Sequence, residues 1–289
     1  MPRKRVMKLT ELKVGNNEFI SWGSRTYVMG IINVTPDSFS GDGIYLNSEK
    51  ALTQALQFVQ DGADFLDIGA ESTRPQHVPV SDTEELDRIM PVILRLLEEI
   101  PLPLSIDTSK SSVALEALKA GAHMINDVTG LNGDPNMAHI LSDWDCPIVI
   151  MHNSNGYDYK EIKSEVRNAL ENSVHRALSA GVQPENIIID PGIGFGKTPD
   201  DNLVLINELQ SINPAGYPTL IGTSRKSTIG HILGTSVGNR LEGTAATVAI
   251  SIARGVDIVR VHDVSQMKRV CTMTDSITRS WRPENWTNP

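Results

Sequence analysis

The sequence predicts an α/β protein whose fold is a single (β/α)8 barrel, also called a TIM barrel. Eight short apolar runs rich in Val, Ile and Leu each end in polar or charged residues, and a stretch with helical periodicity separates successive runs. Such alternation is typical of parallel strands joined by helical crossovers, and eight units can close a barrel. The 289-residue length agrees, because a barrel of this kind needs about 250 residues. We therefore expect one domain over residues 1–289, with a core of about 27–280.

The polar ends of the runs predict where the barrel does its chemistry. Reactive groups of such barrels lie at the carboxyl ends of the strands. The run-ending residues are Asn33, Glu71, Asp107, Asn126 with Asp127, His152, Asp190, Ser224 with Lys226, and Arg260 with His262. We expect these side chains, drawn from the whole chain, to form one site.

Each element can be placed approximately. The strands are expected at 27–33, 64–69, 103–108, 123–128, 146–152, 186–190, 218–223 and 257–262. The helices are expected near 48–60, 82–99, 111–120, 134–143, 160–180, 200–212, 226–254 with a break near 234–238, and 264–280. Residues 8–26 predict a short β-hairpin that covers the bottom of the barrel. Two long loops, 33–47 and 70–81, follow the first two strands and belong to the expected working surface.

Composition narrows the class of protein. The net charge of −9 argues against broad nucleic-acid binding, although a local cationic pocket for a small anion remains compatible with it. Two cysteines make neither a disulfide framework nor a metal cluster. The basic start lacks the apolar stretch of a signal peptide, and no apolar run approaches the roughly 20 residues of a membrane helix. We expect a cytoplasmic protein that does not bind a membrane.

Acceptors and donors at three strand ends fit a flat nitrogen heterocycle. Asp107 and Asp190 offer carboxylates, and the Asn126 amide can both donate and accept hydrogen bonds. Asp107 could instead cap the helix near Ser111, and Asp190 could bind a loop amide. Together the three groups fit a ring that carries an amino group and amide-like N–H groups.

Cationic groups follow the seventh and eighth strands. Arg260 and His262 alternate along one strand, so both side chains point to the same side. Lys226 and Ser227 lie at the start of a helix, where free backbone N–H groups favour anions. These residues predict a polyanion pocket, while a salt bridge within the barrel is the structural alternative for Arg260 and His262.

Two further residues have expected roles. The Asn33 oxygen could join phosphate oxygens and waters around a divalent ion, as Mg²⁺ prefers. Phe195, within a glycine-rich segment, offers a ring for stacking. His152 is equally well explained as a core histidine.

Seven segments together resemble dihydropteroate synthases, the pterin-binding enzymes of folate biosynthesis. They are residues 29–40 (MGIINVTPDSFS), 67–75 (DIGAESTRP), 105–109 (SIDTS), 125–128 (INDV), 190–197 (DPGIGFGK), 224–227 (SRKS) and 260–264 (RVHDV). The resemblance implies a transferase that condenses 6-hydroxymethyl-7,8-dihydropterin diphosphate with 4-aminobenzoate to give 7,8-dihydropteroate and diphosphate. It also implies Mg²⁺ as cofactor and a homodimer formed through the last helices.

The resemblance also assigns residues. Pterin binding falls to Asp107, Asn126, Asp190 and Lys226, and diphosphate binding to Asn33, Arg74, Arg260 and His262, with Asn33 also contacting the metal. Aminobenzoate binding falls to Thr73, Arg74, Pro75, Phe195 and Ser227. The residues expected to act in catalysis are Asp37, Lys226 and Arg260.

The chain departs from the usual family pattern at the Gly41-Asp42 order and at Ala70. Neither position belongs to the predicted pterin site. The alternative function is a methyltetrahydrofolate-binding methyltransferase domain, which would share the pterin acceptors but needs no cationic diphosphate pocket. A barrel that binds a pterin or a protein partner without catalysis is a second alternative.

Overall fold

Ten strands and the helices between them build the protein over the residues that the structure describes. This computed structural model describes residues 11–14, 18–34, 44–71, 79–154, 156, 158–283 and 286–287. The strands are β1 (Glu11–Val14), β2 (Glu18–Ser21), β3 (Tyr27–Asn33), β4 (Phe65–Gly69), β5 (Leu104–Asp107), β6 (Met124–Asp127), β7 (Ile148–Met151), β8 (Ile187–Asp190), β9 (Leu220–Ile221) and β10 (Ile258–Val261). The helices are α1 (Ile44–Gln60), α2 (Asp82–Glu99), α3 (Ser111–Ala120), α4 (Met137–Asp143), α5 (Ile162–Ser179), α6 (Pro199–Asn207), α7 (Leu209–Ile212), α8 (Ser227–Leu233), α9 (Leu241–Ala253) and α10 (Val264–Thr278).

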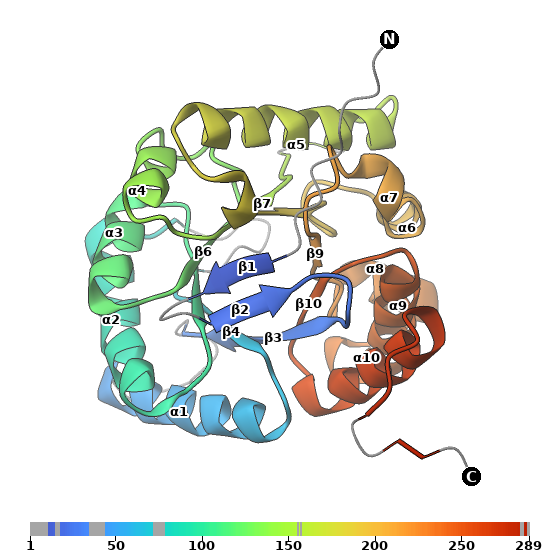
Figure 1. Ribbon diagram of the computed structural model, residues 1–289, viewed down its shortest axis with the longest axis horizontal. Coiled ribbons are helices and arrows are strands. Elements are labelled where there is room, and N and C mark those ends of the chain that lie inside the picture. The colour runs from blue at the N-terminus through green and yellow to red at the C-terminus, as the bar shows by residue number, and fades with distance from the viewer. Residues whose placement is uncertain are drawn as a thin grey trace.

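Strands β3 to β10 form the predicted parallel barrel. Their hydrogen-bonded order is β8-β7-β6-β5-β4-β3-β10-β9, and a parallel bridge between Ile189 and Thr219 joins β8 to the run that contains β9. The helices surround this sheet as an outer ring (Figure 1). The predicted fold class is therefore confirmed.

Some element boundaries differ from the expected ones. β9 is shorter than the predicted strand 218–223, and the predicted helix 200–212 divides between α6 and α7 at Glu208. The segment 226–254 breaks after α8 at Gly234. Gly234 ends α8 with a φ of +65°, a left-handed conformation that glycine adopts without the steric penalty of a side chain. The predicted break near 234–238 is therefore confirmed.

The N-terminal hairpin closes the lower end of the barrel, as predicted. β1 and β2 pair antiparallel and lie across the centre of the ring in Figure 1. Leu12, Val14 and Ile20 are buried against an apolar layer inside the barrel. This layer is made by Tyr27, Met29, Phe65, Met124, Val149, Ile188, Leu220 and Ile258. Burial of this layer leaves the opposite end of the barrel available for polar side chains.

Successive side chains along each strand point alternately to the two faces of the sheet. This alternation separates the apolar core, between sheet and helices, from the polar interior of the barrel. Val28, Leu66 and Ile106 are among the side chains packed between the sheet and the helices. Their sequence neighbours point into the barrel, because successive strand side chains face opposite sides. Among the described residues, no helix is both long and apolar enough to cross a membrane.

Candidate functional site

The strand ends bring most of the predicted residues together at one end of the barrel. The register pairs Asn33 with Gly69, Gly69 with Asp107, and Asp107 with Asn126. Asp190 ends β8, and Arg260 lies on β10. Asp107, Asn126 and Asp190 are each at least nine-tenths buried, so their polar groups face the barrel interior and need partners there.

A buried network joins Arg260 to two carboxylates. The Arg260 Nε–H donates to Asp67 Oδ2 at 2.6 Å, and Nη2 donates to Asp107 Oδ2 at 2.7 Å. Asn126 Nδ2 donates to the same Asp67 oxygen at 3.1 Å. Asp67 is fully buried, and its carboxylate fixes the positions of two predicted site residues, Arg260 and Asn126. The salt-bridge alternative for Arg260 is thus realised in the structure, with the pterin-assigned Asp107 as one partner.

Burial changes the protonation of both predicted pterin carboxylates. It raises the pKa of Asp107 to about 7, against the lowering effect of Arg260 and together with repulsion from Asp67. It also raises the pKa of Asp190 to about 6, although the Gly192 N–H donates to Asp190 Oδ1 at 2.7 Å and lowers it. Carboxyl groups with raised pKa values are well placed to bind N–H groups of a ring that can take up or share positive charge.

Two lysines, Lys226 and Lys197, lie near the Asp190 carboxylate. Lys226 immediately precedes α8, and its Nζ lies 4.1 Å from the centroid of the Phe195 ring. Burial and the nearby Arg260 lower the pKa of Lys226 to about 8. Burial also lowers the pKa of Lys197, a residue not singled out by the sequence analysis, to about 7. Ser227, the first residue of α8, is exposed.

His262 differs from the expected cation. Its Nδ1 lies 3.0 Å from Ser224 Oγ, and burial together with Arg225 and Arg260 lowers its pKa to about 4. The imidazole is therefore neutral at pH 7 and offers a hydrogen bond in place of a charge. Arg225, for its part, binds Asp263 through Nε at 3.0 Å. Arg260 and Lys226 thus supply the positive charge of this region.

Some polar strand ends have structural roles. Asp127 accepts hydrogen bonds from the backbone of Thr129 and Leu131 at 2.8 and 2.7 Å, so it shapes the turn after β6. His152 is buried, and burial lowers its pKa to about 3, which agrees with the core-histidine explanation. Glu71 binds Lys110, which also binds Glu85 of α2 at 2.5 Å.

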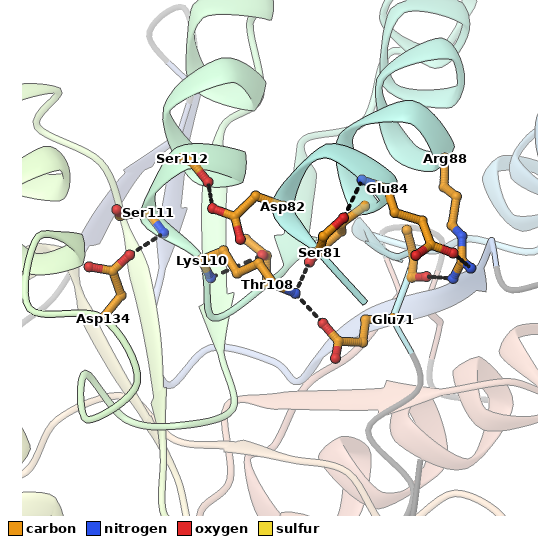
Figure 2. A network of polar contacts seen from close by, with 12 residues as sticks. Glu71, Ser81, Asp82, Glu84, Arg88, Thr108, Lys110, Ser111, Ser112 and Asp134 are labelled. Atoms are coloured by element: carbon orange, nitrogen blue, oxygen red, sulfur yellow. Dashed lines mark hydrogen bonds and ion pairs between the residues drawn. The ribbon is translucent and has the colours of Figure 1, made fainter. Parts of the chain in front are cut away.

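Glu71 and Asp82, on either side of the second long loop, both contact the start of α3. Lys110 points toward Glu71 before the loop, and Ser112 donates to Asp82 after it (Figure 2). The predicted residues Thr73, Arg74 and Pro75 of this loop, and Asp37 of the first loop, lie outside the described residues. A cavity of about 140 Å³ opens between this network and Asp107. It is lined by Glu71, Glu85, Asp107, Thr108, Ser109, Val128, Thr129 and Asn153.

A signal for Asp67 was present in the sequence. It is an acidic residue inside an otherwise apolar run, at the alternate position that faces the barrel, and such a buried charge requires partners. Lys197 has no comparable signal in the sequence, because its partners are backbone carbonyl groups of residues brought close by folding.

The fold and the sequence are those of a pterin-binding enzyme. The sequence profile of the pterin-binding enzyme family matches residues 29–262. The dihydropteroate synthase of Bacillus subtilis (strain 168) is 48% identical over 258 residues, which cover 89% of this chain and 90% of that protein.

Solved structures of dihydropteroate synthases are also similar to this chain. The Clostridium difficile dihydropteroate synthase, crystallised in the presence of pteroic acid, has a TM-score of 0.88 and 48% identity, covering 90% of this chain and 99% of that one. The Xanthomonas albilineans enzyme with 4-aminobenzoic acid has a TM-score of 0.89 and 38% identity, covering 95% and 99%. The chain therefore belongs to the dihydropteroate synthase family of pterin-binding enzymes.

The raised pKa of Asp107 predicts a pH-dependent loss of stability. The folded protein keeps this proton up to about pH 7, whereas an unperturbed carboxyl releases it near 3.8. The unfolded state therefore binds fewer protons in this window, and the free energy of unfolding falls as pH rises through it. We expect Asp107→Asn to make this fall shallower in urea titrations between about pH 4 and pH 7. Asp143→Asn, on the exposed end of α4, is the control, and parallel curves for wild type and Asp107→Asn would contradict the assignment.

Proposed function

We propose that the chain joins 6-hydroxymethyl-7,8-dihydropterin diphosphate to 4-aminobenzoate. The aromatic amine nitrogen forms a bond to the methylene carbon, the bond from that carbon to the diphosphate oxygen breaks, and the amine loses a proton. The products are 7,8-dihydropteroate and diphosphate. The convergence of two buried carboxyl groups, an amide and two cations on one mouth of the barrel carries this proposal, with the named relatives as independent support.

The pterin occupies the space above the buried network. Asp107 and Asp190 accept hydrogen bonds from its N–H groups, and Asn126 both donates to and accepts from the ring. Their burial strengthens these bonds, because the surrounding medium is less polarisable than water. Lys226, whose pKa is lowered mainly by burial, approaches the ring from the Phe195 side.

The diphosphate lies toward β10 and the two long loops. Arg260 supplies a permanent charge and His262 a neutral N–H donor, and we assign Arg74 to the same group by resemblance. These donors stabilise the charge that develops on the leaving oxygen, which lowers the barrier to breaking the carbon–oxygen bond. Arg260 also contacts Asp107, so it connects the pterin side of the site to the leaving group.

Asn33 fits a Mg²⁺ ion only as a single ligand. Its amide sits at the mouth of the barrel, next to Gly69 in the register, and it is partly exposed. The described part of the chain contains no group of three His, Cys, Asp or Glu side chains suited to hold a metal. The remaining ligands would be diphosphate oxygens and waters, as Mg²⁺ commonly prefers. When bound there, the ion neutralises part of the leaving-group charge.

The aminobenzoate lies over Phe195 and Ser227. Phe195 presents a ring beside Lys226, and the Ser227 hydroxyl is exposed where the carboxylate of the substrate arrives. We assign Thr73, Arg74 and Pro75 to the wall of this pocket. Asp37 is assigned to stabilising positive charge on the pterin as the diphosphate departs.

The alternative function, that of a methyltetrahydrofolate-binding methyltransferase domain, requires only the residues that accept hydrogen bonds from the pterin. Arg260 and His262 would then have no diphosphate to bind, and Arg260 would serve Asp67 and Asp107 alone. The conjunction of Arg260, Lys226 and His262 at the same mouth favours the diphosphate-releasing reaction.

We also propose that the protein acts as a homodimer of single-domain chains in the cytoplasm. Helices α8, α9 and α10 lie side by side in Figure 1 and carry large exposed apolar side chains. These are Ile232, Leu233, Ile250, Met273 and Ile277, and Val237 lies between α8 and α9; each is about half exposed or more. An apolar surface of this kind is stabilised when a second copy covers it.

The function is tested by mixing the purified protein with both substrates and Mg²⁺. We expect 7,8-dihydropteroate and diphosphate in equal amounts. The first product is measured by mass spectrometry, and the second as phosphate after treatment with pyrophosphatase. Chelation of the ion should slow turnover, since the leaving group then keeps its full charge. Tight binding of methyltetrahydrofolate with no product from the two substrates would favour the methyltransferase-domain alternative.

The dimer is tested by sedimentation. Wild type should sediment at twice the monomer mass of 31.6 kDa, and Met273→Asp should sediment as a monomer because a charge would be buried in the interface. Leu94→Asp, at a half-exposed position on α2, is the control and should remain a dimer. A monomeric wild type at micromolar concentration would overturn the proposed assembly.

A further inference from the structure

A glycine-containing loop follows β8 and packs tightly against the end of β7. We define the glycine loop as residues 191–196. A Cβ atom added to Gly192 would lie 1.9 Å from the His152 carbonyl oxygen, and one added to Gly196 would lie 2.0 Å from the Ser154 oxygen. Both glycines also have positive φ angles, of +69° and +59°. The loop can therefore approach β7 only with glycine at these positions.

Lys197 fills the space that this loop encloses. Its side chain is almost completely buried, and its Nζ donates to the carbonyl oxygens of Gly192 at 2.9 Å, Phe195 at 2.9 Å and His152 at 3.3 Å. An ammonium group has three N–H donors, so every donor is matched to a carbonyl acceptor. Removal of the ammonium would leave three carbonyl groups without this partner in a buried setting, which is unfavourable.

The groups that Lys197 holds belong to the substrate side of the barrel. The Gly192 carbonyl binds Lys197, while the N–H of the same residue donates to Asp190 Oδ1 at 2.7 Å. The Phe195 carbonyl also binds Lys197, while the ring of that residue lies 4.1 Å from Lys226 Nζ. One buried ammonium thus fixes the residue that orients the Asp190 carboxylate and the residue whose ring contacts Lys226.

Asn202 links the same loop to the start of α8. Its Oδ1 accepts from Gly194 N at 2.8 Å, and its Nδ2 donates to Thr228 Oγ1 at 3.0 Å. The glycine loop is therefore held between β7 on one side and α8 on the other. A shift of the loop would move Phe195 relative to Lys226 and Ser227.

We propose that Lys197 is a positioning residue for both substrates: its ammonium group holds the glycine loop against β7 and so sets the geometry of Asp190 and Phe195. The inference rests on the proposed function for the identity of the substrates. Lys197 itself touches neither substrate; its effect passes through the backbone of Gly192 and Phe195.

The test compares Lys197→Met with two matched variants. Lys163→Met makes the same substitution at a half-exposed position on α5. Thr26→Val removes a buried hydrogen bond to Asp275 near the start of β3, so it controls for a loss of stability far from the site. Calorimetry gives the affinity for the pterin diphosphate, and steady-state kinetics give KM for 4-aminobenzoate and kcat, all well below the unfolding temperature of each variant. Hydrogen exchange reports on the amides of residues 192–196.

We expect Lys197→Met to weaken pterin binding and to raise KM for 4-aminobenzoate by about ten-fold or more, because small misplacements of a site are costly. Amides of the glycine loop should exchange faster, while Lys163→Met behaves as wild type and Thr26→Val loses stability alone. If Lys197→Met lowers the unfolding temperature but leaves affinity, KM and loop exchange unchanged, the positioning role is refuted. A wild type without turnover would instead refute the proposed function, since affinity and exchange are measured without turnover.

Discussion

One buried guanidinium shared between two carboxylates is the constraint on which the site depends. Arg260 binds Asp67 and Asp107 in the barrel interior, directly above the apolar layer closed by the N-terminal hairpin. Breaking one half of such a buried pair leaves an uncompensated charge and is strongly destabilising. Because Asp67 also accepts a hydrogen bond from the Asn126 amide, the four strands β4, β5, β6 and β10 are fixed relative to one another by a few short contacts.

This constraint explains how a protein with a net negative charge can hold two substrates that carry anionic groups. Arg260 and Lys226 lie near Asp107 and Asp190 at this end of the barrel, so the field at the mouth differs from that of the whole molecule. Burial raises the pKa values of Asp107 and Asp190 and lowers those of Lys197 and Lys226, which brings all four into the range from about 6 to 8.

The sequence predicted the barrel, because periodicity and strand-end polarity are local properties of the chain. It also predicted that Asn33, Asp107, Asn126, Asp190 and Arg260 would share one end of the barrel, since parallel strands place their carboxyl ends together. It did not predict that Asp67 joins Arg260 to Asn126, or that Lys197 binds three carbonyl groups, because these contacts depend on distances across the barrel. The lowered pKa of His262 could likewise not be predicted from the sequence, since its cause is burial beside Arg225 and Arg260.

The most direct test is the affinity of Asp67→Asn for the pterin diphosphate, measured by calorimetry. Asparagine keeps the shape of the side chain but removes the charge that holds Arg260, so we predict binding weaker by about ten- to a hundred-fold, with the fold retained. Asp64→Asn, one residue before β4, removes a charge that pairs with Arg25 and Lys268 away from the site and serves as the control. Equal affinities of Asp67→Asn and wild type would contradict the central role of the buried network.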